Sequence, residues 1–204
     1  MNNPSYPIIT IKPKRQESIL RRHPWVFSGA IKKVEGKPGA GDWVKVIANK
    51  GALLGWGHFS PGTSIAIRML TFAEDKPDDQ WWIDKIKEAI SVREMLGLIE
   101  SDTNDTCRLV HAEGDGLPGL IADFYAGVLV IQCHTPGMHN VIKLLCSAFS
   151  DALGEKLVAV YDKSSKALAK HGGTVSEDGV VWGKMSEEHY ATEHGHKFNI
   201  DWEK

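Results

Sequence analysis

Residues 7–72 of this chain form a series of short apolar runs, each closed by glycine or proline before the next begins. Turn signals recur roughly every ten residues, and β-branched and aromatic side chains fill the runs, a pattern typical of short strands. Such strands favour a compact β-barrel. The runs are PIITIKP, WVFSGAIKKVEG, WVKVIA, ALLGWGHFS and TSIAIRMLTF. One helix-like stretch, residues 18–22, interrupts them, and Pro24 predicts that it ends at His23.

From residue 76 onward the pattern changes to helices alternating with strands. WWIDKIKEAISVREMLGLI has apolar residues at steps of three and four, which predicts an amphipathic helix facing a core. Its stripe is Trp82, Ile86, Ala89, Ile90, Arg93 and Leu96 or Gly97. LIADFY and VLVIQC, joined by Ala126 and Gly127, indicate a β-hairpin. A second helix is predicted in HTPGMHNVIKLLCSAFSDALG, ending at Gly154.

The remainder of this second region is predicted as a buried strand, a short helix and a final hairpin. These are LVAVYD, KSSKALAKHGG with a glycine stop, GVVWGK as a further strand, and HYATE–HG–HKFNID. The acidic, proline-bearing stretch at residues 73–80 is predicted as a linker. We therefore expect a β-barrel at residues 1–75 and an α/β (α+β) domain with a mixed sheet and a C-terminal hairpin at residues 76–204.

The run AEGDGLPGLIADFY places Gly114, Gly116 and Gly119 in the spacing G-x-G-x-x-G of dinucleotide-binding loops. Such a loop must open a helix, because the free N–H groups of a helix N-terminus bind the phosphates. Here a strand pattern follows instead, and Pro118 separates the second and third glycines. The acidic ribose contact about twenty residues further on is also missing. A strand–turn–strand, with glycine supplying positive φ, is the favoured interpretation.

The charge is unevenly distributed along the chain. Residues 1–75 contain 11 Lys and Arg against 5 Asp and Glu, whereas residues 76–204 contain 13 against 21. This asymmetry indicates that the first domain binds a polyanion, although surplus lysine also serves solubility. Arginine forks bind phosphates, and an adjacent aromatic ring can stack on an unpaired base. The predicted RNA-binding residues are Lys12, Lys14, Arg15, Arg21, Arg22, His23, Trp25, Lys32 and Lys33.

Two aromatic positions near this cluster have alternative interpretations. Phe27 is expected in the barrel core, and Trp25 is left open between the core and the RNA-binding surface.

Nothing in the sequence assembles a nucleophile with a base and an oxyanion site. Cys133 and Cys146 fall on apolar faces and are expected to be structural. The histidines at positions 189, 194 and 196 are expected to be exposed turn residues rather than zinc ligands. With three cysteines in no C-x-x-C spacing, no apolar run of the roughly 18 residues that span a bilayer, and no secretory signal, we expect a cytoplasmic protein without membrane contact.

Two groups of motifs carry a family resemblance. LRRHPWVFSGAI, GDWVKV and IAIRML resemble the N-terminal PUA domain of the bacterial 23S ribosomal RNA large-subunit methyltransferase I family. RLVHAEGDGLPGLIADFY and then HGHKFNIDWEK continue the resemblance in the same order. The similarity spans nearly the whole chain.

This resemblance implies an S-adenosylmethionine-dependent enzyme that makes 5-methylcytosine in 23S rRNA. The implied mechanism is attack of a cysteine thiolate on C6 of cytosine, methyl transfer to C5, and elimination. In that family the cofactor and the nucleophile belong to a C-terminal Rossmann-like domain, which would start just past Lys204. The resemblance thus implies that this chain binds no cofactor and supplies RNA targeting.

Alternatives remain at this stage. The chain is also compatible with a stand-alone PUA-type RNA-binding adaptor, or with a family member that modifies another rRNA base such as guanine. A third possibility is that the barrel makes protein contacts and the second domain dimerises, giving a homodimer.

Overall fold

The computed structural model describes residues 6–99, 101, 103–170, 176–186 and 188–202, and it divides into two compact units. Unit 1 comprises Met1–Asp78 together with Thr135–Asn140, and unit 2 comprises Asp79–His134 and Val141–Lys204. A short segment from the middle of the chain is therefore part of the N-terminal unit.

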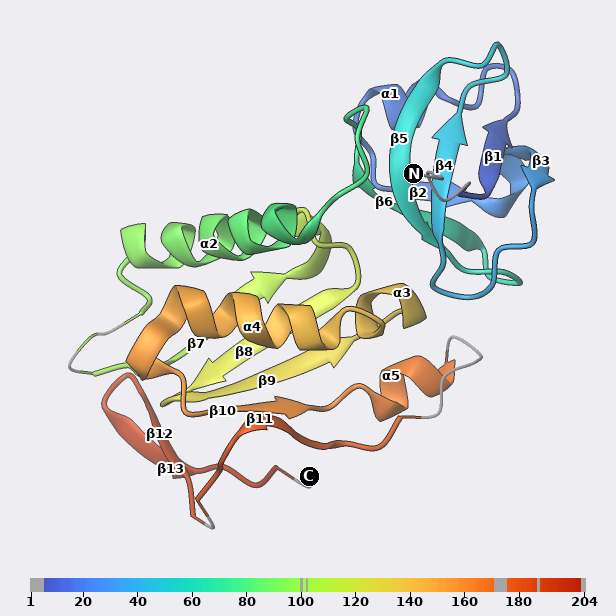
Figure 1. Cartoon of the computed structure of the whole chain (residues 1–204). Coiled ribbons are helices and arrows are strands. Elements are labelled where there is room, and N and C mark those ends of the chain that lie inside the picture. Colours follow the sequence, from blue (N-terminus) through green and yellow to red (C-terminus); the bar gives the residue numbers. More distant parts are fainter. Residues whose placement is uncertain (1–5, 100, 102, 171–175, 187, 203–204) are drawn as a thin grey trace. The chain divides into compact units, whose positions relative to one another are not determined.

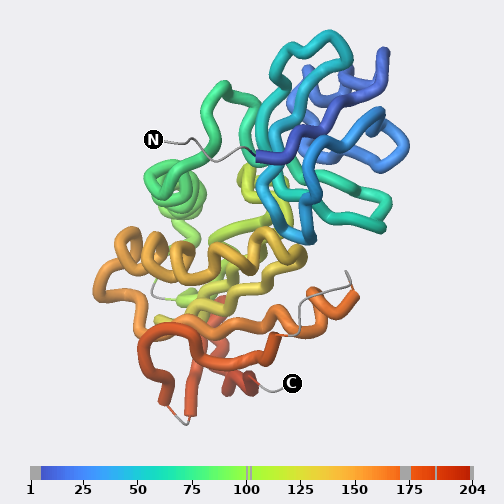
Figure 2. The backbone as a smooth tube through the Cα atoms, turned by 45° about the vertical axis from the view of Figure 1, so that its right-hand side comes forward, coloured from blue at the N-terminus to red at the C-terminus, as the bar shows by residue number. Residues whose placement is uncertain are grey.

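Unit 1 is built on a curled six-stranded sheet, the blue-to-teal part of the backbone in Figure 2. Its strands are β1 (Ile8–Ile11), β2 (Trp25–Phe27), β3 (Ile31–Glu35), β4 (Trp43–Ile47), β5 (Leu53–Phe59) and β6 (Ile65–Thr71). They lie in the order β2-β6-β5-β4-β1-β3, with β1 and β4 parallel and the other pairs antiparallel. The predicted short strands are present, but the run WVFSGAIKKVEG, expected to be one strand, forms the two strands β2 and β3 on either side of a 3₁₀ turn at Ser28–Ala30.

The core of unit 1 follows from the two-residue alternation of its strands. In β4, Val44 and Val46 are buried and their neighbours are partly exposed, so every second side chain faces inward. The helix-like stretch is α1 (Glu17–Leu20), a single turn that places Ile19 in the same core. Strands and helix therefore share one apolar interior.

Unit 2 contains a five-stranded mixed sheet, as predicted. Its strands are β7 (Thr106–His111), β8 (Leu120–Tyr125), β9 (Val128–Cys133), β10 (Ala159–Asp162) and β11 (Gly179–Gly183). The order is β11-β10-β9-β8-β7; β9 and β10 run parallel and the other neighbours antiparallel. β12 (Tyr190–Glu193) and β13 (His196–Asn199) form the predicted final hairpin.

Helices α2 (Asp79–Met95) and α4 (Ile142–Leu153) lie side by side on one face of this sheet (Figure 1). The predicted stripe of α2 is buried as far as Ile90, whereas Leu96 lies beyond the helix and is exposed. The short helix α5 (Ser165–Lys170) is also present, and its predicted glycine stop lies outside the described residues. None of the helices in the described ranges is long and apolar enough to cross a membrane.

The single helix predicted after the β8–β9 hairpin is wrong: the stretch forms two helices, α3 (Pro136–His139) and α4. Thr135 begins α3 by accepting the Met138 N–H at its hydroxyl, with Pro136 in the first turn. α3 belongs to unit 1, where Gly137 lies against the ring of His58. A Cβ at Gly137 would stand 2.6 Å from His58 Cβ and closer to the ring, so only glycine fits.

The stretch predicted as a linker, residues 73–80, contains the division between the two units, but its first part is fastened to unit 1. Trp56 Nε1 donates to the carbonyl of Glu74 over 2.9 Å. Lys76 Nζ lies over the ring of Trp43, 4.9 Å from its centroid, and over Tyr6 at 5.7 Å. The first half of the predicted linker therefore packs on unit 1 through Glu74 and Lys76.

Candidate nucleic-acid interface

The nine residues predicted to bind RNA all lie in unit 1, and the turns on either side of α1 carry most of them. Three cations occupy the connection from β1 to α1, and two more with a histidine occupy the connection from α1 to β2. Trp25 begins β2, and the last two lysines lie on β3. In that order they are Lys12, Lys14, Arg15, Arg21, Arg22, His23, Trp25, Lys32 and Lys33. All are exposed except Trp25, which is half-buried.

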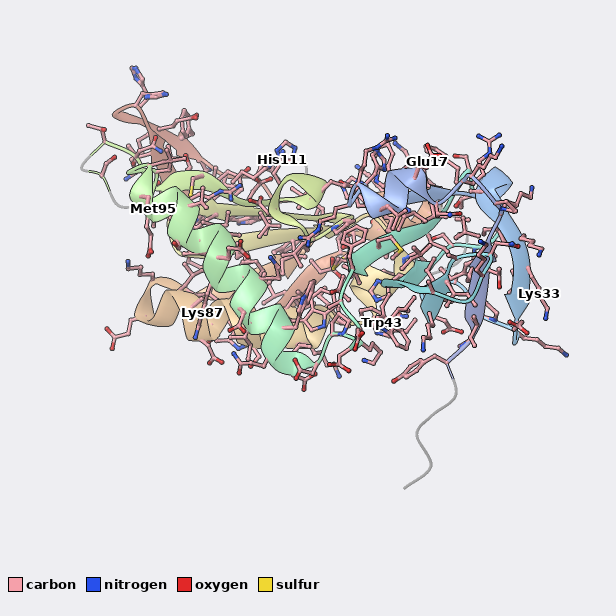
Figure 3. The ribbon with its side chains drawn as sticks, turned by 90° about the horizontal axis from the view of Figure 1, so that it is seen from above. Glu17, Lys33, Trp43, Lys87, Met95 and His111 are labelled. Atoms are coloured by element: carbon pink, nitrogen blue, oxygen red, sulfur yellow. The ribbon has the colours of Figure 1, made fainter. Side chains whose placement is uncertain are left out.

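The two lysines of β3 are separate from this group and already have partners. Lys33 Nζ forms an ion pair with Glu35 at 2.6 Å, and Lys32 Nζ donates to Oδ1 of Asn49, also over 2.6 Å. Figure 3 labels Lys33 on β3 and Glu17 on α1, at different points of the ribbon. An ion pair on the same strand offsets the charge of Lys33, so β3 is the weaker part of the predicted interface.

The cations that flank α1 are less committed. Lys12 Nζ donates to the carbonyl of Gly29 over 2.9 Å. Within the described residues, four further side chains have neither a hydrogen-bond nor an ion-pair partner: Lys14, Arg15, Arg21 and Arg22. Phosphates are the natural partners of exposed guanidinium and ammonium groups. Four uncommitted cations therefore surround one turn of helix.

Two of these cations have a strained backbone. Lys14 has φ of 62° and Arg22 has φ of 61°, both in the left-handed region that β-carbons disfavour. The chain turns back at these points, with the Arg22 N–H donating to the Ile19 carbonyl over 2.8 Å. Each such residue costs about 1–2 kcal/mol relative to the right-handed form. Strain of this kind concentrates at binding sites, which makes these two turns functional candidates.

A row of aromatic rings, with Trp25 half-buried and Phe27 exposed, continues from this cluster along β2. Val26 faces the core with 2% of its surface exposed, so the alternation of the strand turns Trp25 and Phe27 to the other side. Their rings meet edge to face at 6.4 Å, and His23 meets Trp25 at 5.7 Å. Phe27 is 50% exposed, so its expected place in the core is wrong. The sequence signal for this outcome was Val26 between two aromatic residues, because a buried valine turns its neighbours on the strand away from the core.

A hollow of about 340 Å³ lies between α1 and β2, and we call it the α1–β2 hollow. Arg15 and Ser18 supply its polar groups, and the aromatic side chains of β2 supply apolar walls. Its lining residues are Arg15, Ser18, Ile19, Trp25, Val26, Phe27, Gly29 and Ala30. Sequence reasoning identified Arg15 and Trp25 but missed Ser18, Ile19 and Phe27.

The glycine run in unit 2 is a strand–turn–strand, as predicted. β7 leads into a 3₁₀ turn, η2 (Ala112–Asp115), and β8 begins directly after Gly119. Gly116 and Gly119 have φ of 70° and 86°, whereas a Cβ at Gly114 would meet nothing within 4 Å. Because a strand follows the glycines, no helix N-terminus is available, and this loop does not fit a nucleotide's phosphates.

Asp115 of this turn is held by α2. Arg93 donates from Nη1 and Nη2 to the two carboxylate oxygens at 2.5 and 2.8 Å, and the backbone N–H of His111 donates to Oδ2 over 2.5 Å. Burial alone would raise the pKa of Asp115, but these hydrogen bonds outweigh it and lower the pKa below its usual value. The side chains of Arg93 and Asp115 are 12% and 13% exposed, so this ion pair fixes the η2 turn to α2.

The cysteines are poor nucleophiles in this structure. Burial raises the pKa of the Cys107 thiol to about 11 and that of Cys146 to about 11, and it raises the pKa of Cys133 further. Each thiol therefore remains protonated at neutral pH, and only the thiolate attacks carbon. Cys133 and Cys146 are buried, as expected for structural residues.

Of the three C-terminal histidines expected to be exposed turn residues, only His194 is one, because His189 is partly buried and His196 lies on a strand. The His189 ring nitrogen Nε2 lies 2.7 Å from the carbonyl oxygen of Tyr125, while His194 turns the β12–β13 hairpin with φ of 51°. His196 is exposed on β13. In the part of the chain that the structure describes, no three His, Cys, Asp or Glu residues are grouped to hold a metal ion.

Residues 9–72 match a family described as "PUA-like domain". This chain is 34% identical to "Ribosomal RNA large subunit methyltransferase I" of Salmonella arizonae. The aligned 200 residues are 97% of this chain and 49% of that relative. The enzyme of the same name from Salmonella typhimurium is 33% identical over the same shares. The chain thus spans about half the length of the curated relatives it matches.

Two solved structures share the fold. "A putative sam-dependent methyltransferase from Streptococcus mutans" superposes with a TM-score of 0.76 and 13% identity, covering 94% of this chain and 47% of that one. The crystal structure of a putative methyltransferase complexed with SAH gives the same values. The PUA-like match lies within unit 1, and the chain as a whole has the fold of about half of each of these proteins.

Proposed function

We propose that this chain is the RNA-binding and orienting part of an S-adenosylmethionine-dependent 23S rRNA methyltransferase that forms 5-methylcytosine. The similarity to rRNA large-subunit methyltransferases across nearly the whole chain supports the reaction class. The group of uncommitted cations around α1 on a PUA-like domain is the observation that carries the RNA-binding role. Such an enzyme acts on ribosomal RNA in the cytoplasm.

Unit 1 binds the phosphates of the RNA. The guanidinium forks of Arg15, Arg21 and Arg22 and the ammonium group of Lys14 each neutralise a phosphate, and each releases condensed counterions. Four such contacts give a steep salt dependence: raising the salt from 50 to 200 mM weakens binding about 50- to 150-fold. Lys32 and Lys33 contribute less, because they first have to leave Asn49 and Glu35.

In our proposal, this chain supplies neither the binding site for the methyl donor nor the nucleophilic cysteine. The glycine run does not fit a nucleotide, and the thiols of Cys107, Cys133 and Cys146 are held protonated by burial. We therefore expect the chain to bind structured rRNA weakly and S-adenosylmethionine not at all. Isothermal titration calorimetry with the cofactor tests this part, and micromolar binding would contradict it.

The RNA-binding role is tested by charge reversal on the turn after α1. The double variant Arg21→Glu/Arg22→Glu should lose RNA affinity by about 100-fold at low salt, because two attractive phosphate contacts become repulsive. Fluorescence anisotropy with a labelled 23S rRNA fragment, repeated across a salt series, measures both the affinity and its slope.

The matched control applies the same charge change to unit 2. Lys87 on α2 and Lys166 on α5 are both exposed, and Lys87→Glu/Lys166→Glu should leave RNA binding within about twofold of the parent. Equal losses in the two double variants would mean that only net charge matters, and the proposed interface would be wrong.

The choice of base is tested in the organism that makes the protein. Deleting its gene should remove a single 5-methylcytosine from 23S rRNA, detected by bisulfite sequencing. Loss of a methylated guanine with every 5-methylcytosine retained would keep the methyltransferase assignment and overturn the cytosine specificity.

A further inference from the structure

The α1–β2 hollow differs in chemistry from the cationic turns beside it. Phosphates need charge, yet most of its lining is apolar: Ile19 is buried at 2% exposure, and Trp25 and Phe27 contribute aromatic surface. The two rings are inclined at 89° to each other, so one presents a face where the other presents an edge. A flat ring fits a corner of this kind, because it can stack on one aromatic while touching the edge of the other.

The hollow also contains polar groups that can bind a nucleotide. Arg15 lines it with a guanidinium that has no partner among the described residues, and the hydroxyl of Ser18 supplies both a donor and an acceptor. Gly29 lines the hollow without a side chain, and a Cβ there would meet nothing within 4 Å. The volume of about 340 Å³ is at the lower end of the range for small-molecule sites.

We propose that the α1–β2 hollow receives one unpaired base of the bound RNA, stacked on Trp25 against the edge of Phe27. Arg15 binds the phosphate of that nucleotide or the edge of its base, and the cations at the turns of α1 hold the flanking backbone. This inference rests on the proposed RNA-binding function and specifies the form of RNA that unit 1 selects. A fully paired helix cannot supply such a base, since its bases remain stacked on one another.

The expected effect is large enough to measure. Stacking of one base on an aromatic side chain contributes about 1–3 kcal/mol, which corresponds to about 5- to 150-fold in affinity. Hairpins that differ only at one nucleotide offer the same number of phosphates, so the difference between their affinities isolates the hollow.

The experiment compares three RNA hairpins of identical length and charge by fluorescence anisotropy at fixed salt. One is fully paired, one carries a single bulged nucleotide, and one carries the same bulge without its base. We expect the bulged hairpin to bind at least tenfold more tightly than the paired hairpin, and the abasic bulge to lose that gain. Each of the four bases is tested at the bulge, and the tightest defines the preference.

Variants assign the gain to the hollow. Trp25→Ala and, separately, Phe27→Ala should remove the preference for the bulge while retaining the salt-dependent binding to the paired hairpin. Leu20→Ala is the matched control, because Leu20 is 64% exposed on α1 and does not line the hollow. Thermal unfolding of each variant verifies that unit 1 remains folded, and Phe27→Ala serves if Trp25→Ala does not fold.

The outcomes separate this inference from the proposed function. Salt-dependent binding with equal affinity for all three hairpins would overturn the base-binding hollow and leave the RNA-binding role standing. No detectable binding to any hairpin or to the 23S rRNA fragment would overturn both. A bulge preference that survives in Trp25→Ala and in Phe27→Ala would place the base elsewhere and contradict the inference.

Discussion

Arginine has opposite roles in the two units. In unit 1, Arg21 and Arg22 lie in an exposed turn and have no side-chain partner among the described residues. In unit 2, Arg93 makes a two-point ion pair with Asp115, and Arg108 pairs with Asp123 at 2.7 Å. Unit 2 uses Arg93 and Arg108 to hold its own strands and turns together, whereas unit 1 leaves Arg21 and Arg22 available.

This difference shows how to separate a binding surface from a charged structural surface. Counting charges alone gives residues 1–75 a surplus of Lys and Arg, but it does not show which side chains are already paired. Lys33 is exposed and still paired with Glu35, while Arg22 is exposed and held in a strained turn. A cation that is unpaired, strained and adjacent to exposed aromatics is a stronger candidate than one that is only exposed.

The largest effect is expected where α3 completes unit 1. Gly137→Ala forces a Cβ into the ring of His58, and we expect the free energy of unfolding to fall by about 3 kcal/mol. Gly114→Ala in unit 2 is the matched change, because its Cβ would meet nothing, and it should be neutral within about 1 kcal/mol. Urea denaturation monitored by tryptophan fluorescence measures both. Similar values for the two variants would show that α3 does not pack as described.

The two units should also lose stability in different pH ranges. Burial first, and the charge of Lys76 second, lower the pKa of His58 in unit 1 to about 3 from 6.5. Because the unfolded chain takes up a proton below pH 6.5 and the folded unit does not, unit 1 loses stability as the pH falls, by about 2 kcal/mol at pH 5. The lowered pKa of Asp115 contributes to unit 2 above pH 3.8, and that contribution disappears only as the pH falls below this value.

Peptide-resolved hydrogen exchange at pH 7 and pH 5 distinguishes these ranges. We expect faster opening of the strands of unit 1 at pH 5, with β7–β10 of unit 2 unchanged after correction for the intrinsic rate. His58→Asn should lose most of this dependence in unit 1. If lowering the pH to 5 sped amide exchange in unit 2 and not in unit 1, the expected order of acid sensitivity would be wrong.

The smallest effect concerns the strained turn of unit 1. Arg22→Gly relieves the left-handed backbone at φ of 61° and should raise the free energy of unfolding by up to about 1 kcal/mol, offset in part by the flexibility of glycine in the unfolded chain. The same change removes one phosphate contact, so RNA affinity should fall a few-fold and the salt slope by about 0.7–0.9. Chemical denaturation and anisotropy measure the two effects. A less stable variant would mean that the turn carries no strain.

Much of the architecture follows from local patterns in the sequence. The short run WVKVIA between turn residues predicted β4, and the Ala126–Gly127 turn predicted the β8–β9 hairpin, because turn chemistry is a property of neighbouring residues. The cluster of cations between residues 12 and 22 was visible for the same reason. Which of these cations already have a partner was not visible, since the Gly29 carbonyl that Lys12 binds lies 17 residues away along the chain.

The errors arose where tertiary contacts decide the outcome. HTPGMHNVIKLL has a continuous helical pattern, but Thr135 and Pro136 start a separate short helix that packs on His58. Arg93 was placed on the apolar stripe of α2 without a partner, and its partner Asp115 is 22 residues away. A cation on an apolar stripe requires an acidic partner nearby, and the sequence alone does not show which acid the fold brings to it.

Ultraviolet crosslinking of the chain to 23S rRNA, followed by mass spectrometry of the RNA-linked peptides, tests most directly that RNA binds to unit 1. We expect the crosslinked residues to fall around α1 and β2, with His23, Trp25 and Phe27 among them, and to disappear in Arg21→Glu/Arg22→Glu. Crosslinks concentrated on the strands and helices of unit 2, unaffected by that variant, would contradict the account.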